Sequence, residues 1–311
     1  DGQRAVTRVE DGVTVVHNPK KGAPPPGVPS SLTLKPDLTI GNEAGDENYM
    51  FSQLRSVAVD DRENIYALDM KEIKVRAFDR DGKHFRTFGK KGKGPGEIDS
   101  PLRMEMTRGD LLVIEDFSSA KFVVFSLDGA VVKEIPLGKY RFVIRFKFNS
   151  LGNIYADART YDETKSTSEM IKFSPDFKPL SVIDSFVEKR GGRELTAFSP
   201  SFALQVTRGD SLILTVTQAA AYEFKVMDPD GKLVRRVVKD YEPVKVTAAI
   251  KDKLLKDSWG DQGVPAGYTA TTLSNASASA PAGAPPPWAS RRGSPTPPRR
   301  RPRTPPCTPH C

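Results

Sequence analysis

One short phrase recurs four times along this chain, and it constrains the fold more than any other feature of the sequence. The copies are Phe78–Lys83, Phe125–Ala130, Phe173–Lys178 and Met227–Lys232. Their spacings are 47, 48 and 54 residues, and a nearly fixed period of this length indicates a repeat architecture. The repeat bears on the fold. It does not identify a substrate or a partner.

Each phrase belongs to a larger unit of short strand-like segments. A run rich in β-branched and aromatic residues precedes every phrase, and a polar turn precedes that run. The runs are Asn64–Asp69, Asp110–Asp116, Asn153–Asp157 and Ser211–Val216. Asp and Gly suit the turns, because both tolerate a positive φ. The order is therefore strand, turn, strand, loop, strand, Asp-Gly turn, strand. Four short strands in about 40–50 residues are typical of a propeller blade, and no helical periodicity competes.

The sequence thus predicts an all-β fold, a β-propeller with four-stranded antiparallel blades. Residues 1–30 form an N-terminal arm, and residues 31–257 form the propeller. The predicted blades are residues 54–101, 102–140, 141–200 and 201–245, followed by a helical insertion at 246–257. Residues Ser31–Ile40 are expected to form an outer strand, because Ile40–Leu54 aligns without a gap with Phe88–Leu102. Four complete blades plus N-terminal strands imply an incomplete ring with an open edge.

The first unit resembles a known repeat. Val57–Tyr66, Val75–Lys83 and Phe88–Glu97 look like an NHL repeat, and weaker copies extend to about residue 257. More narrowly, the chain resembles the bacterial six-bladed β-propeller proteins of the NHL-repeat superfamily. Many of those are secreted or lipid-anchored. The resemblance is specific for fold and unspecific for activity, since such propellers include both binding platforms and lactonase-like or lyase-like enzymes.

The C-terminal segment differs sharply in composition from the rest. From Ser274 to Cys311 it holds six arginines, 11 of the 26 prolines and both cysteines. Without those arginines the net charge of +8 falls to +2, so the body gives no reason to expect nucleic-acid binding. Residues 258–311 are expected to be a disordered Pro/Arg-rich tail. Two interpretations remain: a Pro/Arg interaction tail, or an out-of-frame translation of a GC-rich gene that truncates the propeller.

The cellular location of the protein is predicted from its cysteine content, its hydropathy and its first residues. The body contains no cysteine, so disulfides do not contribute to its fold. The sequence contains no run of 18 apolar residues. It begins Asp1-Gly2-Gln3, as a mature or trimmed product would. Together with the family resemblance, this predicts an extracellular or periplasmic protein, with any lipid anchor removed with the N-terminus.

Candidate metal ligands are carboxylates, because histidine is scarce. His17, His84 and His310 are the only histidines, and none lies on a predicted blade strand in a way that suggests catalysis. Asp69, Asp116 and Asp157 fall at strand ends that look equivalent. Such positions in a propeller can face the central channel and hold Ca²⁺, or they can cap turns by accepting hydrogen bonds from backbone amides.

Candidate ligand-binding residues lie in two segments. Residues 159–169 lengthen the middle loop of the third unit, and long loops on a rigid scaffold often bind ligands. Arg145, Arg159 and Tyr161 are the residues singled out there. Lys90, Lys91 and Lys93 lie in an inter-blade loop that lacks the phosphate-loop pattern but could attract an anion. Arg108-Gly109-Asp110 and Arg208-Gly209-Asp210 spell an adhesion tripeptide twice, which a turn requiring glycine explains.

Two functions follow as hypotheses. The first is a secreted or periplasmic binding module that holds a protein, a peptide or a glycan through loops on one face of the ring, without catalysis and without a cofactor. The alternative is a metal-dependent lactonase-like or lyase-like enzyme, with a carboxylate-bound divalent cation, such as Ca²⁺, in the central channel.

Overall fold

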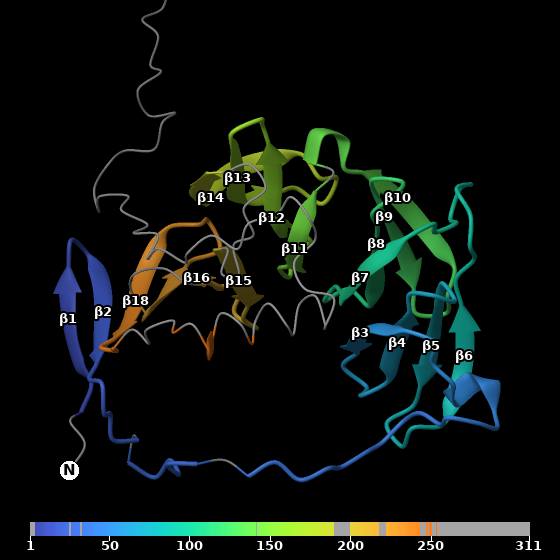
Figure 1. Ribbon diagram of the computed structural model, residues 1–311, viewed down its shortest axis with the longest axis horizontal. Helices are drawn as coiled ribbons and strands as arrows, with labels where there is room; N and C mark the ends of the chain where they lie inside the picture. Colours follow the sequence, from blue (N-terminus) through green and yellow to red (C-terminus); the bar gives the residue numbers. More distant parts are fainter. Residues whose placement is uncertain are drawn as a thin grey trace, which may run out of the picture. The chain divides into compact units, whose positions relative to one another are not determined.

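Strands that are consecutive in the sequence pair with one another to form four sheets (Figure 1). The computed structural model describes residues 4–24, 26–31, 33–140, 142–189, 200–217 and 222–242, together with residues 247, 249, 250 and 253. Residues 1–275 form one compact unit. A second unit, residues 276–311, lies outside the described residues.

Each sheet corresponds to one predicted repeat. The first contains β3 (Leu54–Val59), β4 (Ile65–Asp69), β5 (Lys74–Phe78) and β6 (His84–Phe88). The second contains β7 (Pro101–Met106), β8 (Leu111–Asp116), β9 (Lys121–Ser126) and β10 (Val131–Pro136). The third contains β11 (Val143–Phe148), β12 (Ile154–Tyr161), β13 (Lys165–Phe173) and β14 (Pro179–Lys189). The fourth contains β15 (Ser201–Val206), β16 (Leu212–Thr217), β17 (Tyr222–Met227) and β18 (Leu233–Lys239). Two short 3₁₀ turns, η1 (Glu47–Tyr49) and η2 (Gly138–Tyr140), lie between strands.

The sheets pack face to face in sequence order through three apolar clusters. Tyr66, Val75 and Ala77 of the first sheet meet Met104 and Leu112 of the second. The second and third sheets share a cluster centred on Phe122 and Phe146, and the third and fourth share one centred on Tyr155 and Phe202. The first strand of each sheet contacts the first strand of the next: β3 contacts β7, β7 contacts β11, and β11 contacts β15. These sheets are the blades of a β-propeller, which confirms the predicted all-β fold.

The N-terminus adds strands to the fourth blade. β1 (Val6–Glu10) and β2 (Val13–Asn18) form a hairpin, and β2 pairs with β18 in parallel, so this sheet has six strands. The strand expected at Ser31–Ile40 was wrong, since residues 33–40 carry no strand. Pro36 lacks an N–H for a ladder there, and Leu38 and Ile40 instead lie against Gly82 of the first blade.

The turns between the first two strands of each blade share a side-chain cap. Asp60, Thr107, Asn149 and Thr207 each accept a hydrogen bond from the backbone N–H four residues later. Both Arg-Gly-Asp tripeptides lie in these turns, but the reason proposed for them was wrong. The residues with positive φ are Asp110 (55°) and Asp210 (61°), and neither glycine of the tripeptides is among them. Aspartate tolerates this conformation because its short polar side chain can bond locally.

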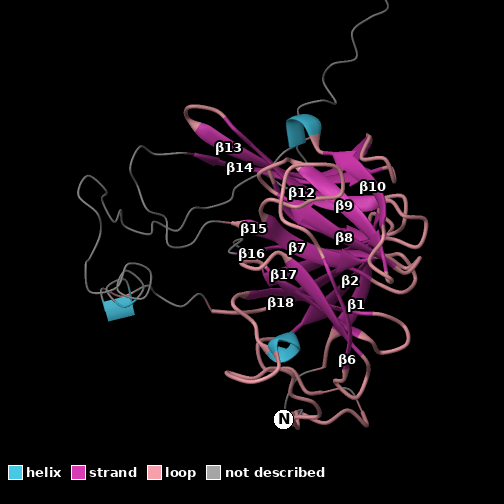
Figure 2. Ribbon diagram, turned by 90° about the vertical axis from the view of Figure 1, so that its right-hand side faces the viewer, coloured by secondary structure: helices cyan, strands magenta, loops and turns pink. Residues whose placement is uncertain are grey.

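The segment at residues 159–169 is a strand extension, which corrects the predicted long loop. β12 and β13 continue through it and pair up to Tyr161 and Ser166, and β14 follows alongside (Figure 2). Only Asp162–Thr164 remain as a turn, in which the Asp162 carboxylate accepts bonds from the N–H groups of Thr164 and Lys165, both at 2.8 Å. Strand-favouring residues in the segment, such as Thr160 and Thr167, explain why it pairs.

Two predicted segments fall outside most of the described residues. The helical insertion at 246–257 is described at only a few positions, and the tail at 258–311 lies wholly outside.

Removing Phe122 tests the packing between blades. Its ring is buried and lies 4.6 Å from the ring of Phe146 and 5.3 Å from that of Phe177. We expect Phe122→Ala to lower the free energy of unfolding by about 4 kcal/mol, because it leaves a cavity between two sheets. Urea denaturation followed by circular dichroism measures this. Phe85→Ala, which removes a half-exposed ring of β6, is the control, and equal losses in both variants would contradict the assignment.

Candidate functional site

The first two strands of the second and third blades bring charged side chains together. Arg103 on β7 donates to the carboxylate of Glu115 on β8 at 2.9 Å and to the backbone carbonyl of Val143 at 3.3 Å. Lys147 on β11 bridges back to Glu105 on β7 at 2.7 Å. Burial raises the pKa of Glu115, although Arg103 opposes the shift. The junction between these blades is therefore a charged inner wall above an apolar cluster.

Asp157 on β12 lies on the opposite face of the third blade, the face whose Tyr155 packs against the fourth blade, and it is the least satisfied charged group near these residues. It is 0% exposed, and neither carboxylate oxygen has a hydrogen-bond partner among the described residues. Burial raises its pKa to about 6, while the charges of Arg159, Arg145 and Arg103 act in the opposite direction. A buried carboxylate that is near arginines and yet not bonded to them is energetically costly. Costly arrangements of this kind concentrate at functional sites.

Two side chains of β12 follow Asp157 along the same face of the strand. Because side chains alternate across a strand, Asp157, Arg159 and Tyr161 share a face. Asp157 is buried, Arg159 is partly exposed and Tyr161 is 45% exposed. Arg159 donates to Ser168 at 2.8 Å and to the carbonyl of Pro200 at 3.3 Å. Exposure to solvent therefore increases along this face, from the buried carboxylate of Asp157 to the exposed ring of Tyr161.

Arg145 and two further rings complete the group. Arg145 lies opposite Asp157 in the register of β11 and β12, is exposed, and has no hydrogen bond or ion pair with a described residue. The ring of Phe142 lies edge-on to Tyr161 at 5.3 Å, and Phe117 lies 6.0 Å from Phe142. We call Arg145, Asp157, Arg159, Tyr161 and these two rings the β12 site. Sequence reasoning singled out Arg145, Arg159 and Tyr161 for a ligand and Asp157 for a metal, and the structure places these four residues on one face of the third blade. It did not single out the two phenylalanines.

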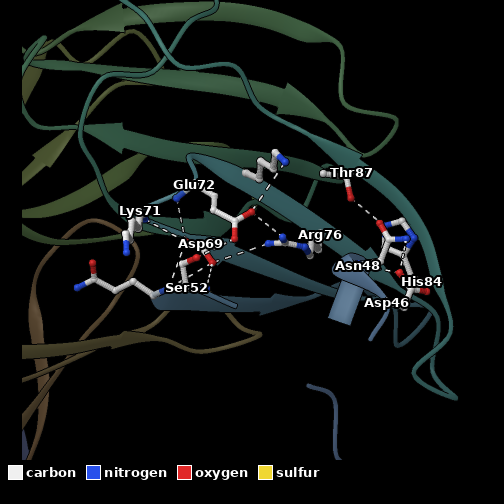
Figure 3. Close-up of polar contacts among 11 residues, drawn as sticks. Asp46, Asn48, Ser52, Asp69, Lys71, Glu72, Arg76, His84 and Thr87 are labelled. Atoms are coloured by element: carbon white, nitrogen blue, oxygen red, sulfur yellow. Dashed lines mark hydrogen bonds and ion pairs between the residues drawn. The ribbon is translucent and has the colours of Figure 1, made fainter. Parts of the chain in front are cut away.

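Asp69 caps the start of the first blade (Figure 3). Its carboxylate accepts hydrogen bonds from the N–H groups of Ser52 (2.6 Å), Gln53 (3.2 Å), Lys71 (3.0 Å) and Glu72 (3.0 Å). Burial alone would raise its pKa, but these four bonds outweigh burial, so the pKa of Asp69 is lowered. The carboxylate joins the loop before β3 to the turn after β4, which is a structural task.

Arg76 extends this network at a surface cavity. It donates to Glu72 at 2.7 Å and lies 3.8 Å from Asp69 (Figure 3). Its guanidinium also lies over the ring of Phe51. The neighbouring cavity of about 420 Å³ is lined in part by Glu72, Lys74 and Arg76. Lys74 also lies 3.8 Å from Glu72, so the charges at this cavity compensate one another. We therefore do not choose it as the functional site.

The three aspartates are not equivalent, which corrects the prediction. Asp69 lies opposite Leu54, and Asp116 lies opposite Pro101. In the third blade the residue at this position is Ala158, opposite Val143. Asp157 is thus one residue earlier, at the position of Glu115, and points to the other face of its sheet.

The two equivalent aspartates share a structural role. Asp116 accepts from the N–H groups of Asp99 (3.1 Å) and Ser100 (2.9 Å), as Asp69 does from its own loop. Within the part of the chain that the structure describes, no three His, Cys, Asp or Glu side chains are grouped to hold a metal ion. The geometry therefore gives the proposed calcium ligands no common site.

The three loop lysines do not converge as a basic site. Lys90 pairs with Glu97 at 2.6 Å, and Lys93 lies 3.6 Å from Asp99. Lys91 is exposed, and its backbone bridges to Ile98. Glu97 also accepts a bond from the N–H of Gly94, so its carboxylate organises the glycine loop around it. Neighbouring acids compensate two of the three charges.

Residues 45–228, more than half of the chain, match one family model, described as a 6-bladed beta-propeller. The chain belongs to this family, DUF5128. The description agrees with the sheets and with the predicted resemblance to six-bladed propellers. No curated protein matches the chain.

Solved structures give the DUF5128 chain distant propeller neighbours. One is a Bacteroides fragilis protein whose name ascribes export to it, with 13% identity, a TM-score of 0.49, and coverage of 71% of this chain and 60% of that one. Another is virginiamycin B lyase from Staphylococcus aureus, with 12% identity, a TM-score of 0.36, and coverage of 59% and 55%. The chain thus spans little more than half the length of these proteins. Among the described residues, no helix is long and apolar enough to cross a membrane.

Loss of the Asp69 cap should destabilise the first blade. We expect Asp69→Ala to lower the free energy of unfolding by about 3 kcal/mol, because four backbone N–H groups lose a charged acceptor. Since the pKa of Asp69 is lowered in the folded state, its contribution is present above the unfolded value of 3.8 and is lost as pH falls below it. Urea denaturation at pH 7 and at pH 3 measures both effects. Asp81→Ala, at an exposed turn, is the control and should change neither the free energy of unfolding at pH 7 nor its decrease at pH 3.

Asp157 should produce the opposite pH dependence. Its folded pKa of about 6 exceeds the ordinary value of 3.8, so the folded state holds this proton more tightly than the unfolded chain. Stability should therefore fall as pH rises from about 4 to 6, by up to about 3 kcal/mol. We expect Asp157→Asn to remove this dependence and to raise the free energy of unfolding at pH 8. Equal pH profiles of the variant and the parent protein would contradict the assignment.

Proposed function

We propose that this DUF5128 chain is an exported binding module that holds an acidic glycan at the β12 site. The observation that carries the proposal is the exposed guanidinium of Arg145, which has no hydrogen bond or ion pair with a described residue and lies on the sheet face that carries Tyr161 four residues beyond its partner Asp157. Arginine binds carboxylates through two parallel N–H donors. An aromatic ring offers a flat apolar face against which the C–H side of a sugar ring packs.

The surrounding charges favour an acidic ligand over a neutral one. Arg103, Arg145 and Arg159 all lie within electrostatic reach of Asp157. Arg103 pairs with Glu115 and Arg159 lies 4.0 Å from Glu188, so Arg145 is the arginine of this group without an ion pair to a described residue. Asp157 is buried, so its role is to hold the arginines by charge without occupying their hydrogen-bond donors. The guanidinium of Arg145 therefore stays available for a carboxylate of the ligand.

A binding role fits this site better than catalysis. The aspartates proposed as calcium ligands bond backbone amides or face another direction. Export remains part of the proposal and rests on the sequence composition and the family resemblance. A glycan-binding propeller outside the cytoplasm would meet acidic polysaccharides directly.

Calorimetry with a defined probe tests the proposal. We expect a galacturonic acid tetrasaccharide to bind, and its methyl-esterified form to bind at least tenfold more weakly, since it lacks the charges that Arg145 recognises. Arg145→Ala should cost about 1.5–3 kcal/mol of binding free energy, the value of a hydrogen bond to a charged group. Arg80→Ala, on an exposed turn of the first blade, is the control. Absence of binding to any acidic oligosaccharide, or equal affinity of the two variants, would overturn the proposal.

A second variant separates function from stability. We expect Asp157→Asn to unfold at a higher urea concentration at pH 8 and yet to bind the tetrasaccharide more weakly, because the arginines lose the charge that positions them. A more stable variant with unchanged affinity would assign Asp157 a role outside the site. Both quantities come from one protein preparation, by urea denaturation and calorimetry.

A further inference from the structure

Three rings of the β12 site form a row at one end of the second and third blades. Phe117 directly follows β8, Phe142 directly precedes β11, and Tyr161 ends β12. All three positions therefore lie at the strand ends opposite the turn that joins the first two strands of each blade. The ring centroids of Phe117 and Phe142 lie 6.0 Å apart, and those of Phe142 and Tyr161 lie 5.3 Å apart. Phe117 is 38% exposed and Tyr161 is 45% exposed. We call these three residues the aromatic row.

Backbone hydrogen bonds hold the aromatic row in place. The N–H of Phe117 donates to the carbonyl of Ser100 at 3.0 Å, and the carbonyl of Phe142 accepts from the N–H of Arg159 at 2.8 Å. Tyr161 belongs to the ladder between β12 and β13. Rings on an ordered backbone lose little conformational freedom when a ligand binds, so the row is a preformed contact surface.

The aromatic row lies beyond Arg145 along the sheet. Arg145 pairs with Asp157, and Tyr161 follows Asp157 by four residues on the same face. At a rise of about 3.3 Å per residue, the backbone of Tyr161 is about 13 Å farther along the strand than that of Asp157. Phe142 precedes Arg145 by three residues, which is about 10 Å in the same direction. A ligand that contacts both the guanidinium of Arg145 and the row is therefore an extended chain.

We propose that the aromatic row is a second contact of the β12 site and that it makes this site select extended acidic oligosaccharides over single acidic sugars. The inference rests on the proposed function and specifies its ligand. One acidic sugar bonds to Arg145, and the sugars that follow it in the chain pack on Phe142 and Tyr161. The row is a single line of rings that continues into the polar turn Asp162–Thr164. Sugars match such a line, because their rings have apolar faces and polar edges, whereas a protein partner would favour a broad apolar patch.

Galacturonic acid and its tetrasaccharide test the proposal on the full chain. Calorimetry measures the tetrasaccharide directly, and the single sugar is titrated as its competitor. We expect the parent protein to bind the tetrasaccharide at least about tenfold more tightly than the single sugar. Tyr161→Ala should weaken binding of the tetrasaccharide about tenfold and that of the single sugar no more than about twofold, because only the longer chain reaches the row. Tyr161→Phe restores the ring and should recover most of the loss. Phe85→Ala, which removes an exposed ring of the first blade, is the control.

The outcomes separate this inference from the proposed function. If Arg145→Ala abolishes binding of the tetrasaccharide and Tyr161→Ala leaves it unchanged, the acidic-glycan site stands and the aromatic row has no part in it. Equal losses of Tyr161→Ala for both ligands also overturn the inference, since the ring would then contact the sugar at Arg145 itself. If the parent protein binds neither ligand, the proposed function fails and the inference fails with it. Circular dichroism checks folding, and Phe117→Ala, in a loop of the same row, replaces Tyr161→Ala if that variant does not fold.

Discussion

Packing between neighbouring blades is the interaction on which the rest of this structure depends. No single sheet here encloses an apolar core, and the three apolar clusters of the described residues each form between two neighbouring sheets. Phe122 and Phe146 illustrate the rule, because the two rings come from different blades and bury each other. Stability therefore accumulates junction by junction, as it does in other repeat folds.

The sequence predicted the blades because their period and their turns are local. Asp-Gly turns such as Asp81-Gly82 and the apolar runs before them recur in each copy, and both features appear without knowledge of the tertiary structure. The N-terminal hairpin was not predicted, since its pairing of β2 with β18 joins residues more than 200 positions apart. The strand expected at Ser31–Ile40 failed for a local reason, the missing N–H of Pro36.

The candidate site was predicted in part. Arg159 and Tyr161 were chosen for a loop, with Arg145 nearby, and that loop proved to be a hairpin extension, so the reason for choosing them was wrong. The sequence-based prediction aligned Asp157 with Asp69 and Asp116 because each ends its apolar run. If the runs are instead aligned at their first residues, Asn64 and Asn153, Asp157 falls at the position of Leu68. A shift of one residue reverses the face to which a side chain points. The repeat period of the sequence does not show whether strands of different blades should be aligned at their first or at their last residues.

The position of Asp157 also explains why a buried charge persists in an otherwise apolar junction. At the same position the first blade has Leu68, fully buried, and the second has Glu115 bonded to Arg103. The fold therefore accepts an apolar residue or a paired acid there, and a leucine would cost the third blade less than an unbonded carboxylate. The acid lies near three arginines and bonds to none of them, and only Arg145 among these has no other hydrogen bond to a described residue. Such an arrangement lowers stability in a way that the requirements of the fold do not explain.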